Sequence, residues 1–90
     1  MIQSFGDRDT EKVYMGGRVG SFAAFQATLE RKLVALDEAD DLRDLAAVPG
    51  HRLERLKSSG LYSIRINDRW RLVFRWCDEG PEKVKVEDYH

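Results

Sequence analysis

The sequence has few of the residues that build metal sites and disulfide frameworks. It contains one cysteine, two histidines and two prolines in 90 residues. Because a single cysteine forms no internal disulfide and offers no second thiolate for zinc, we expect Cys77 to be a buried, unreactive thiol in a strand. Neither His51 nor His90 has a carboxylate at metal-ligand spacing, so we predict no bound metal.

Long hydrophobic runs and phosphate-binding loops are also missing. No stretch approaches the roughly 18 consecutive apolar residues of a membrane span, and residues 1–9 lack the basic start and apolar run of a signal peptide. The sequence has no GxxxxGK[ST] or GxGxxG motif, and its serines lack a nucleophile-elbow context. We therefore expect a cytoplasmic protein with no membrane contact and no cofactor.

The length of the chain and the distribution of its charges indicate how many domains it has and whether it can bind nucleic acid. A chain of 90 residues has room for one compact core, so we expect a single domain over residues 1–90. The net charge is −1, which by itself argues against a nucleic-acid-binding protein. Residues 51–75, however, hold seven Lys or Arg against two Asp or Glu, and this basic block lies between two acidic segments.

Helical patterns occupy the first half of the chain. Residues 2–5 could form an edge strand, and Asp7 and Asp9 are candidate caps for a short helix that stops at Gly16. From Ser21 onward apolar residues recur at steps of three and four, which predicts an amphipathic helix with Gln26 among its polar residues. Asp40 and Asp41 introduce a last short helix ended by Pro49-Gly50. The apolar stripe consists of Phe22, Phe25, Leu29, Leu33 and Leu36.

After Gly50 the apolar period changes to two, which predicts strands over residues 51–56, 61–66, 70–76 and 83–89, with turns at 57–60 and 77–81. A two-residue loop at Asn67-Asp68 would mix arginine and apolar residues on both faces. A three-residue loop pairs Ile66 with Trp70, and it puts the apolar residues on one face and the arginines on the other. We therefore prefer the three-residue loop. The predicted inner face then carries Ile64, Ile66, Trp70, Leu72, Phe74 and Trp76, and the outer face carries Ser63, Arg65, Arg71, Val73 and Arg75, joined by Tyr89.

These elements predict an α+β fold in which the N-terminal helices pack on one face of a small twisted antiparallel sheet. The other face should be open and cationic. Cleaving RNA without a metal requires a base for the 2′-hydroxyl, an acid for the leaving oxygen and cations for the phosphate. Side chains on the predicted open face could supply all three, but they could equally be a solvated surface with a loose tail. They are Lys57, Arg65, Arg71, Arg75, Tyr89 and His90.

Three stretches favour the first alternative, because together they resemble the HigB branch of the RelE/ParE toxin superfamily. They are PGHRLERLK at residues 49–57, YSIRINDRWRLVFRW at 62–76 and VKVEDYH at 84–90. The resemblance implies a RelE-like toxin fold and a ribosome-dependent, metal-independent endoribonuclease that cuts messenger RNA in the A site. It also implies a HigA-like helix-turn-helix antitoxin as partner, with operator DNA bound only through that antitoxin.

The resemblance also implies which residues act. His90 or Tyr89 would transfer protons, Arg71 and Lys57 would contact the scissile phosphate, and Asp88 would orient its neighbours. Position 54 is a histidine in some members of the family and is Glu54 here. The residues expected to contact RNA are Arg65, Arg75, Arg52 and Glu54.

Two departures from the family pattern are visible. The turn at residues 57–60 is short and has fewer charged residues than usual, and the chain is acidic overall. Both departures predict weaker ribosome binding, because affinity for RNA depends steeply on the number of phosphates neutralised. The alternative function is a non-catalytic or attenuated binding module of the RelE/ParE fold, either a topoisomerase inhibitor or an antitoxin-bound co-repressor.

Overall fold

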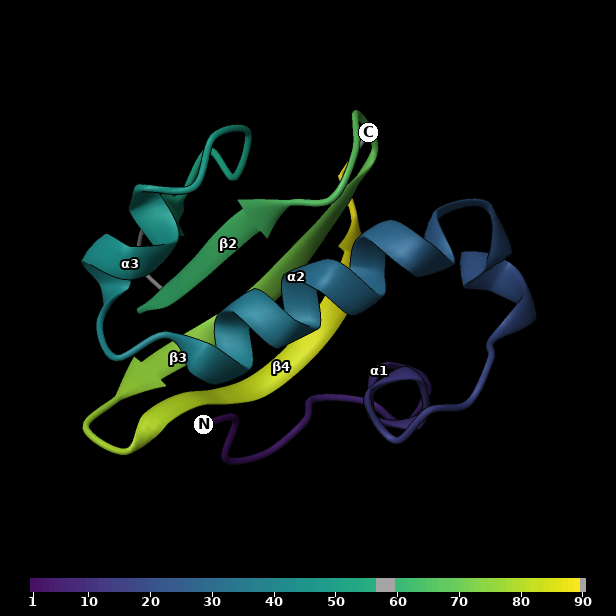
Figure 1. The fold of residues 1–90 in the computed structure, drawn as a ribbon, viewed down its shortest axis with the longest axis horizontal. Coiled ribbons are helices and arrows are strands. Elements are labelled where there is room, and N and C mark those ends of the chain that lie inside the picture. The colour runs from purple at the N-terminus through teal and green to yellow at the C-terminus, as the bar shows by residue number, and fades with distance from the viewer. Residues whose placement is uncertain (57–59, 90) are drawn as a thin grey trace.

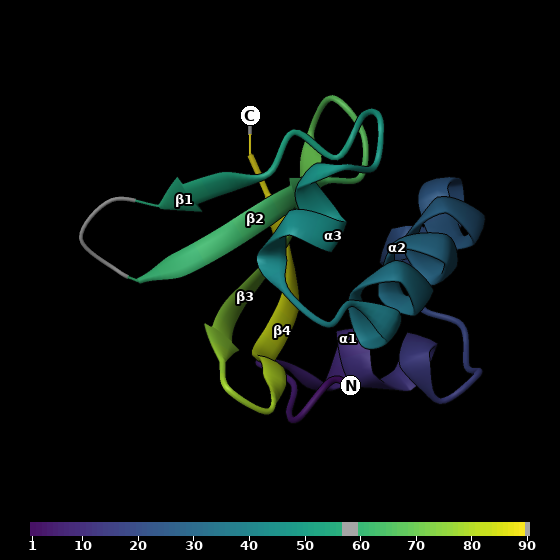
Figure 2. The same ribbon diagram turned by 60° about the vertical axis from the view of Figure 1, so that its left-hand side comes forward.

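The computed structural model describes residues 1–56 and 60–89. In this part of the chain the helices come first: α1 (Arg8–Tyr14), a 3-10 helix (Gly20–Phe25), α2 (Gln26–Glu38) and α3 (Leu42–Ala46). The strands follow as β1 (Glu54–Leu56), β2 (Leu61–Arg65), β3 (Trp70–Cys77) and β4 (Gly80–Asp88). All neighbouring strands are antiparallel, in the order β1-β2-β3-β4. Figure 2 shows the helices gathered on one side of the sheet, so the α+β prediction is confirmed.

Side-chain caps fix where the short helices begin. The carboxylate of Asp7 accepts from the amide of Thr10 at 2.8 Å and starts α1. Asp41 accepts from the amide of Arg43 at 2.7 Å, while Asp44 accepts from the amide of Asp41 at 3.3 Å, which forms a capping box at α3. Caps of this kind satisfy amides that a helix leaves unpaired and are typically worth about 1 kcal/mol.

The amphipathic segment from Ser21 covers the inner face of the sheet, as predicted. It begins as the 3-10 helix and continues as α2, which lies over β3 and β4 (Figure 1). The prediction for Gln26 was wrong. This side chain is buried, and its amide nitrogen donates to the carbonyl of Gly17 at 3.1 Å, because the 3-10 turn directs it toward the preceding loop. The buried apolar residues of the segment are Phe22, Phe25, Leu29, Leu33 and Leu36.

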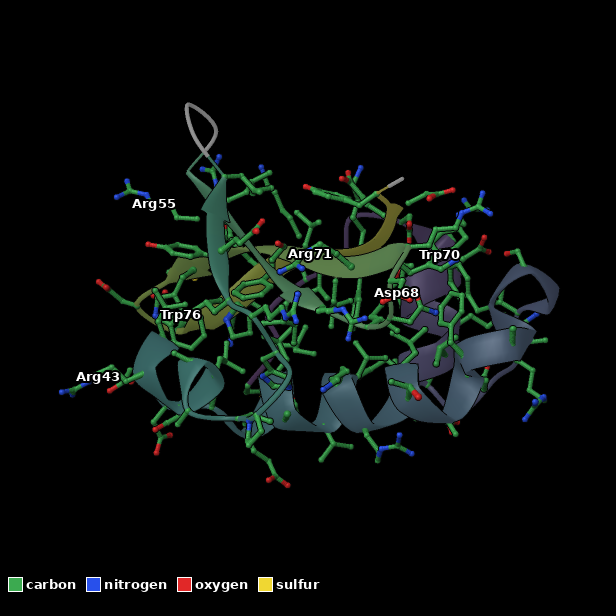
Figure 3. The ribbon with its side chains drawn as sticks, turned by 90° about the horizontal axis from the view of Figure 1, so that it is seen from above. Arg43, Arg55, Asp68, Trp70, Arg71 and Trp76 are labelled. Carbon is green, nitrogen blue, oxygen red and sulfur yellow. The ribbon has the colours of Figure 1, made fainter. Side chains whose placement is uncertain are left out.

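The predicted register of the central hairpin is confirmed. Ile64 lies opposite Leu72, and the amide of Ile66 donates to the carbonyl of Trp70 at 2.9 Å. The inner face therefore buries Ile64, Leu72 and Phe74 completely, and burial of each large apolar side chain is worth about 1.5–3 kcal/mol. Trp70 and Trp76 are only partly buried because they lie at opposite ends of β3 (Figure 3).

The β3–β4 hairpin is tighter than predicted, because both strands run almost to the turn. Cys77 pairs with Gly80, so the turn consists of residues 78–79 instead of 77–81. Gly80 has φ of 134°, and a side chain there would clash with the carbonyl oxygen of Met1. Glycine is therefore required where the N-terminal segment crosses the hairpin. Cys77 is half-buried, and this burial raises the pKa of its thiol.

A bulge interrupts β4 where Lys83 and Val84 together oppose Phe74. Val73 pairs with Lys85 while Arg75 pairs with Glu82, and Lys83 has φ of 53°. The N-terminal segment bonds to the outer edge of β4: the carbonyl of Ser4 accepts from the amide of Val84 at 3.1 Å. Residues 2–6 thus run along β4, with a parallel bridge from Phe5 to Val84, much like the predicted edge strand.

No helix among the residues that the structure describes is long and apolar enough to cross a membrane.

Candidate active site

A polar hollow of about 300 Å³ lies on the outer face of the sheet, beside the loop that joins β2 to β3. The side chains around it come from the segment before β1, from β1 itself, and from the end of β2. The others come from the β2–β3 loop, from the beginning of β3 and from the residue after β4. We call it the Arg71 hollow. It is lined by Arg52, Glu54, Arg65, Asn67, Asp68, Arg71 and Tyr89.

Arg71 is held firmly by hydrogen bonds and is only 9% exposed. Its Nε donates to the hydroxyl of Ser63 at 2.8 Å, and one Nη donates to the carbonyl of Arg52 at 2.6 Å and to that of Ser63 at 3.3 Å. The prediction of an open outer face was therefore wrong at Arg71. The register that aims Arg71 outward is right, but the backbone of a neighbouring segment covers much of the side chain.

That covering segment is the chain between α3 and β1. The sequence predicts a strand from residue 51, whereas β1 begins at Glu54 because Gly50 and Arg52 have positive φ, 84° and 46°. This path lays residues 51–53 along the edge of β2, where the carbonyl of His51 accepts from the amide of Arg65 at 2.7 Å. The carbonyl of Arg52 consequently faces the guanidinium of Arg71.

His51 is itself buried below this segment and does not reach the hollow. Its Nδ1 lies 2.9 Å from the carbonyl oxygen of Leu45, which fixes the tautomer with the proton on Nδ1. Burial lowers the pKa of His51, the hydrogen bond to Leu45 opposes this shift, and the charge of Lys32 adds to it. The side chain acts in the core as a neutral group.

Tyr89 brings the C-terminal end of the chain to the hollow. Its amide donates to the carbonyl of Arg69 at 2.6 Å, which places Tyr89 and the end of β4 beside the β2–β3 loop (Figure 1). Partial burial raises the pKa of the phenol, and the carboxylate of Glu87 adds to this while Arg71 opposes it. Tyr89 is therefore a protonated phenol at neutral pH and can donate a hydrogen bond or a proton.

The hollow is of mixed charge, whereas the sequence predicts a basic patch. Arg65 forms an ion pair with Asp68, and the carboxylate of Glu54 lies on the same wall. Asn67 shapes the loop, since its side-chain oxygen accepts from the amides of Arg69 and Trp70 at 2.9 and 2.8 Å. The cations of the hollow thus face anionic side chains that a bound phosphate must displace or outcompete.

Two predicted site residues lie elsewhere. Asp88 lies opposite Trp70, and its two carboxylate oxygens accept from Arg69 at 2.7 to 2.9 Å, so this carboxylate holds an arginine of the β2–β3 loop in place. Arg75 is exposed and lines a second groove farther along β3. Lys57 and His90 lie outside the described residues.

Ser63 is a residue of the site for which the sequence indicates an outer-face position but no role. It is completely buried, and it accepts from Arg71 through its hydroxyl. The sequence feature that could have indicated this role is a small hydroxyl residue at an outward position of β2, the strand that pairs with β3. For Asn67 and Asp68 the sequence indicates only a loop, because their place beside the hollow depends on how that loop bends.

The arrangement suits the binding of a phosphodiester. Arg71 offers a planar guanidinium whose position is set by three hydrogen bonds, and Arg52 and Arg65 add positive charge nearby. Tyr89 adds a proton donor on the wall of the same hollow. Among the residues that the structure describes, His, Cys, Asp and Glu side chains do not gather in threes or more where they could hold a metal ion.

Comparisons with known proteins show the family to which the chain belongs. Residues 3–90 match the family model of HigB-like toxins, described as the RelE-like toxin of the type II toxin–antitoxin system HigB. The chain is also 41% identical over 82 residues to Toxin HigB-1 of Vibrio cholerae serotype O1 (strain ATCC 39315 / El Tor Inaba N16961), across 87% of this chain and 86% of that protein. The chain therefore belongs to the HigB-like, RelE-like toxins of type II toxin–antitoxin systems, and this membership implies an antitoxin partner.

Proposed function

We propose that this toxin is an endoribonuclease that cuts messenger RNA in the ribosomal A site, without a catalytic metal ion, and that a HigA-like helix-turn-helix antitoxin holds it inactive in the cytoplasm. Operator DNA would be bound only through the antitoxin. The observation that carries the proposal is the guanidinium of Arg71, fixed by Ser63 and by the carbonyl of Arg52 in a hollow that also holds the phenol of Tyr89.

In the proposed reaction the 2′-hydroxyl of the RNA attacks the adjacent phosphorus. The bond from phosphorus to the 5′-oxygen breaks, leaving a 2′,3′-cyclic phosphate and a 5′-hydroxyl. Arg71 stabilises the additional negative charge on the phosphate oxygens, together with Lys57. His90 accepts the proton of the 2′-hydroxyl as the attack proceeds, and Tyr89, which is protonated at neutral pH, donates a proton to the leaving oxygen.

The remaining side chains of the hollow would position the RNA. Arg65 and Arg52 can contact flanking phosphates, and Glu54 can accept from a base or a ribose hydroxyl. Arg75 would contact the strand beyond the hollow. Asp88 would hold Arg69 and, through it, the backbone from which Tyr89 extends.

The proposal is tested with purified toxin, ribosomes and a message whose A-site nucleotide is either unmodified or 2′-deoxy. We expect a cut in the A-site codon of the unmodified message, cyclic phosphate ends on the product, no cut in the 2′-deoxy message, and little or no cutting of naked RNA. Rapid cutting of naked RNA would contradict ribosome dependence. Growth inhibition without any cleavage would favour the non-catalytic binding module.

A further inference from the structure

A second hollow of about 420 Å³ lies on the same outer face of the sheet, farther from the β2–β3 loop. Its basic side chains come from β3 and from the bulged part of β4, and its floor is apolar. We call it the lysine groove. It is lined by Phe5, Gly6, Leu61, Val73, Arg75, Lys83 and Lys85.

The lysine groove continues the Arg71 hollow along β3. Arg71, Val73 and Arg75 are alternate residues of that strand, so all three face outward, and Val73 forms part of the groove floor. Four residues of extended strand span about 13 Å, which is more than one phosphate group can bridge. A ligand that reaches both Arg71 and Arg75 must therefore be a strand with several phosphates.

Two lysines of β4 line this groove. Lys83 takes a left-handed backbone conformation at the bulge, and Lys85 lies directly opposite Val73. Gly6 leaves the necessary space, since a side chain there would lie 3.1 Å from Cδ of Lys85. The result is three cationic side chains around one groove.

The two hollows differ in their balance of charge. Glu54 and Asp68 line the Arg71 hollow, whereas no carboxylate is among the described residues that line the lysine groove. Glu87 lies just outside the groove, with its Oε1 2.9 Å from Nζ of Lys85. This exposed pair is worth little in water and can yield to a phosphate group.

We infer that the lysine groove binds the phosphate backbone of the same RNA strand that enters the Arg71 hollow, so that Arg75, Lys83 and Lys85 hold the message downstream of the cut. This inference rests on the proposed function. It also gives the protein a way to bind RNA despite its net negative charge, because affinity follows the phosphates that are neutralised and not the total charge of the chain.

The test measures binding and not cleavage. Ribosomes are programmed with messages that carry 2′-O-methyl groups in the A-site codon, which prevents cutting, and that either end at this codon or continue well beyond it. We compare the unaltered toxin, the double variant Lys83→Gln/Lys85→Gln, and a control, Arg31→Gln/Arg43→Gln, that removes the same charge from exposed positions on the helices. The two substitutions in the groove keep the β-carbon and most of the stem, so the bulge is not strained further.

We expect the groove variant to bind the long-message ribosomes about tenfold more weakly than the unaltered toxin. The slope of log affinity against log salt should become shallower by about 0.7 for each phosphate that the variant no longer neutralises. It should bind the short-message ribosomes as the unaltered toxin does, and the control should match the unaltered toxin on both. Circular dichroism and thermal unfolding establish that each variant is folded.

Three results would overturn the inference: equal affinity of the groove variant for long messages, equal weakening with short and long messages, or weakened binding of the antitoxin with ribosome binding intact. Equal weakening would assign the groove to ribosomal RNA, and loss of antitoxin binding would assign it to the antitoxin. A toxin that binds these ribosomes but leaves an unmodified message uncut would contradict the proposed function. The comparison of long and short messages would still test the lysine groove, because it measures binding and not cleavage.

Discussion

The Nε of Arg71 donates to the hydroxyl of Ser63 at 2.8 Å, and both side chains are buried on the outer face of the sheet. Because Ser63 also accepts from the same guanidinium through its carbonyl, one residue of β2 fixes both the direction and the depth of Arg71. The arginine is thus part of the packing of the sheet as well as the principal cation of the hollow.

Ser63→Ala should therefore affect stability and cleavage together. Losing one partner of a buried hydrogen bond costs about 1–3 kcal/mol in the free energy of unfolding. We expect in addition a clear decrease in the cleavage rate of ribosome-bound message with little change in ribosome affinity, because Arg71 is less well positioned. Val84→Ala, a buried change on the inner face, serves as the control: if it lowers cleavage as much at equal stability, the positioning role of Ser63 is wrong.

The central hairpin could be predicted from the sequence because one physical rule decides it. Only one register puts Ile64 and Leu72 on the same face, and a shift by one residue would expose the whole hydrophobic set. The helix covering that face could be predicted for a similar reason, since its apolar residues recur at helical spacing. The spacing of apolar residues is the strongest pattern in a sequence of this size, because it shows which face of each element is buried.

The covering of Arg71 could not be predicted in the same way. It depends on the positive φ values of Gly50 and Arg52, which direct residues 51–53 along the edge of β2, and a non-glycine residue in this conformation leaves no periodic signal. The ion pair between Asp88 and Arg69 is a different case. Asp88 lies on the same side of β4 as Val84 and Val86. Alternation along that strand therefore indicates from the sequence alone that the side chains of Asp88 and Tyr89 point to opposite faces of the sheet.

Tyr89 should work as a protonated phenol. Its pKa is raised from the ordinary value of 10.0, chiefly by burial, so it keeps its proton throughout the neutral and mildly basic range. We expect Tyr89→Phe to slow cleavage by about 10²-fold or more, within the range typical of general acids. The rate of the unaltered toxin should show no loss attributable to tyrosine ionisation below about pH 10. Single-turnover rates on ribosome-bound message check this, and a basic limb near neutrality that disappears in Tyr89→Phe would contradict it.

His51 should make stability depend on pH. Burial holds its pKa below the ordinary value of 6.5, so the unfolded chain binds a proton at this residue more readily than the folded protein does. The stabilising contribution is present above the unfolded pKa and is lost as the pH falls below about 6.5. Urea unfolding across this range should show the decrease in the unaltered protein and a smaller one in His51→Asn. His90→Gln is the matched control, and a decrease that disappears there but persists in His51→Asn would show that the assignment is wrong.

Residues 89–90 should themselves be functional, because Tyr89 reaches the hollow and His90 follows it directly in the sequence. We expect proteins that end at Tyr89, or that carry a short neutral tail after His90, to cleave ribosome-bound message much more slowly than the protein ending at His90. Their thermal unfolding should be unchanged. Equal cleavage rates in all three would remove His90 from the mechanism.

The most direct test of the account compares Arg71→Ala with Arg55→Ala on ribosome-bound message. Both changes remove one arginine from the same sheet, but Arg71 is fixed in the hollow whereas the side chain of Arg55 points into solvent (Figure 3). Arg71→Ala should also lose about 1–3 kcal/mol of stability, so rates are compared where each variant is fully folded. We expect a loss of about 10²-fold or more for Arg71→Ala and a rate close to that of the unaltered toxin for Arg55→Ala. Folded Arg71→Ala that cuts the A-site codon at the unaltered rate would contradict it.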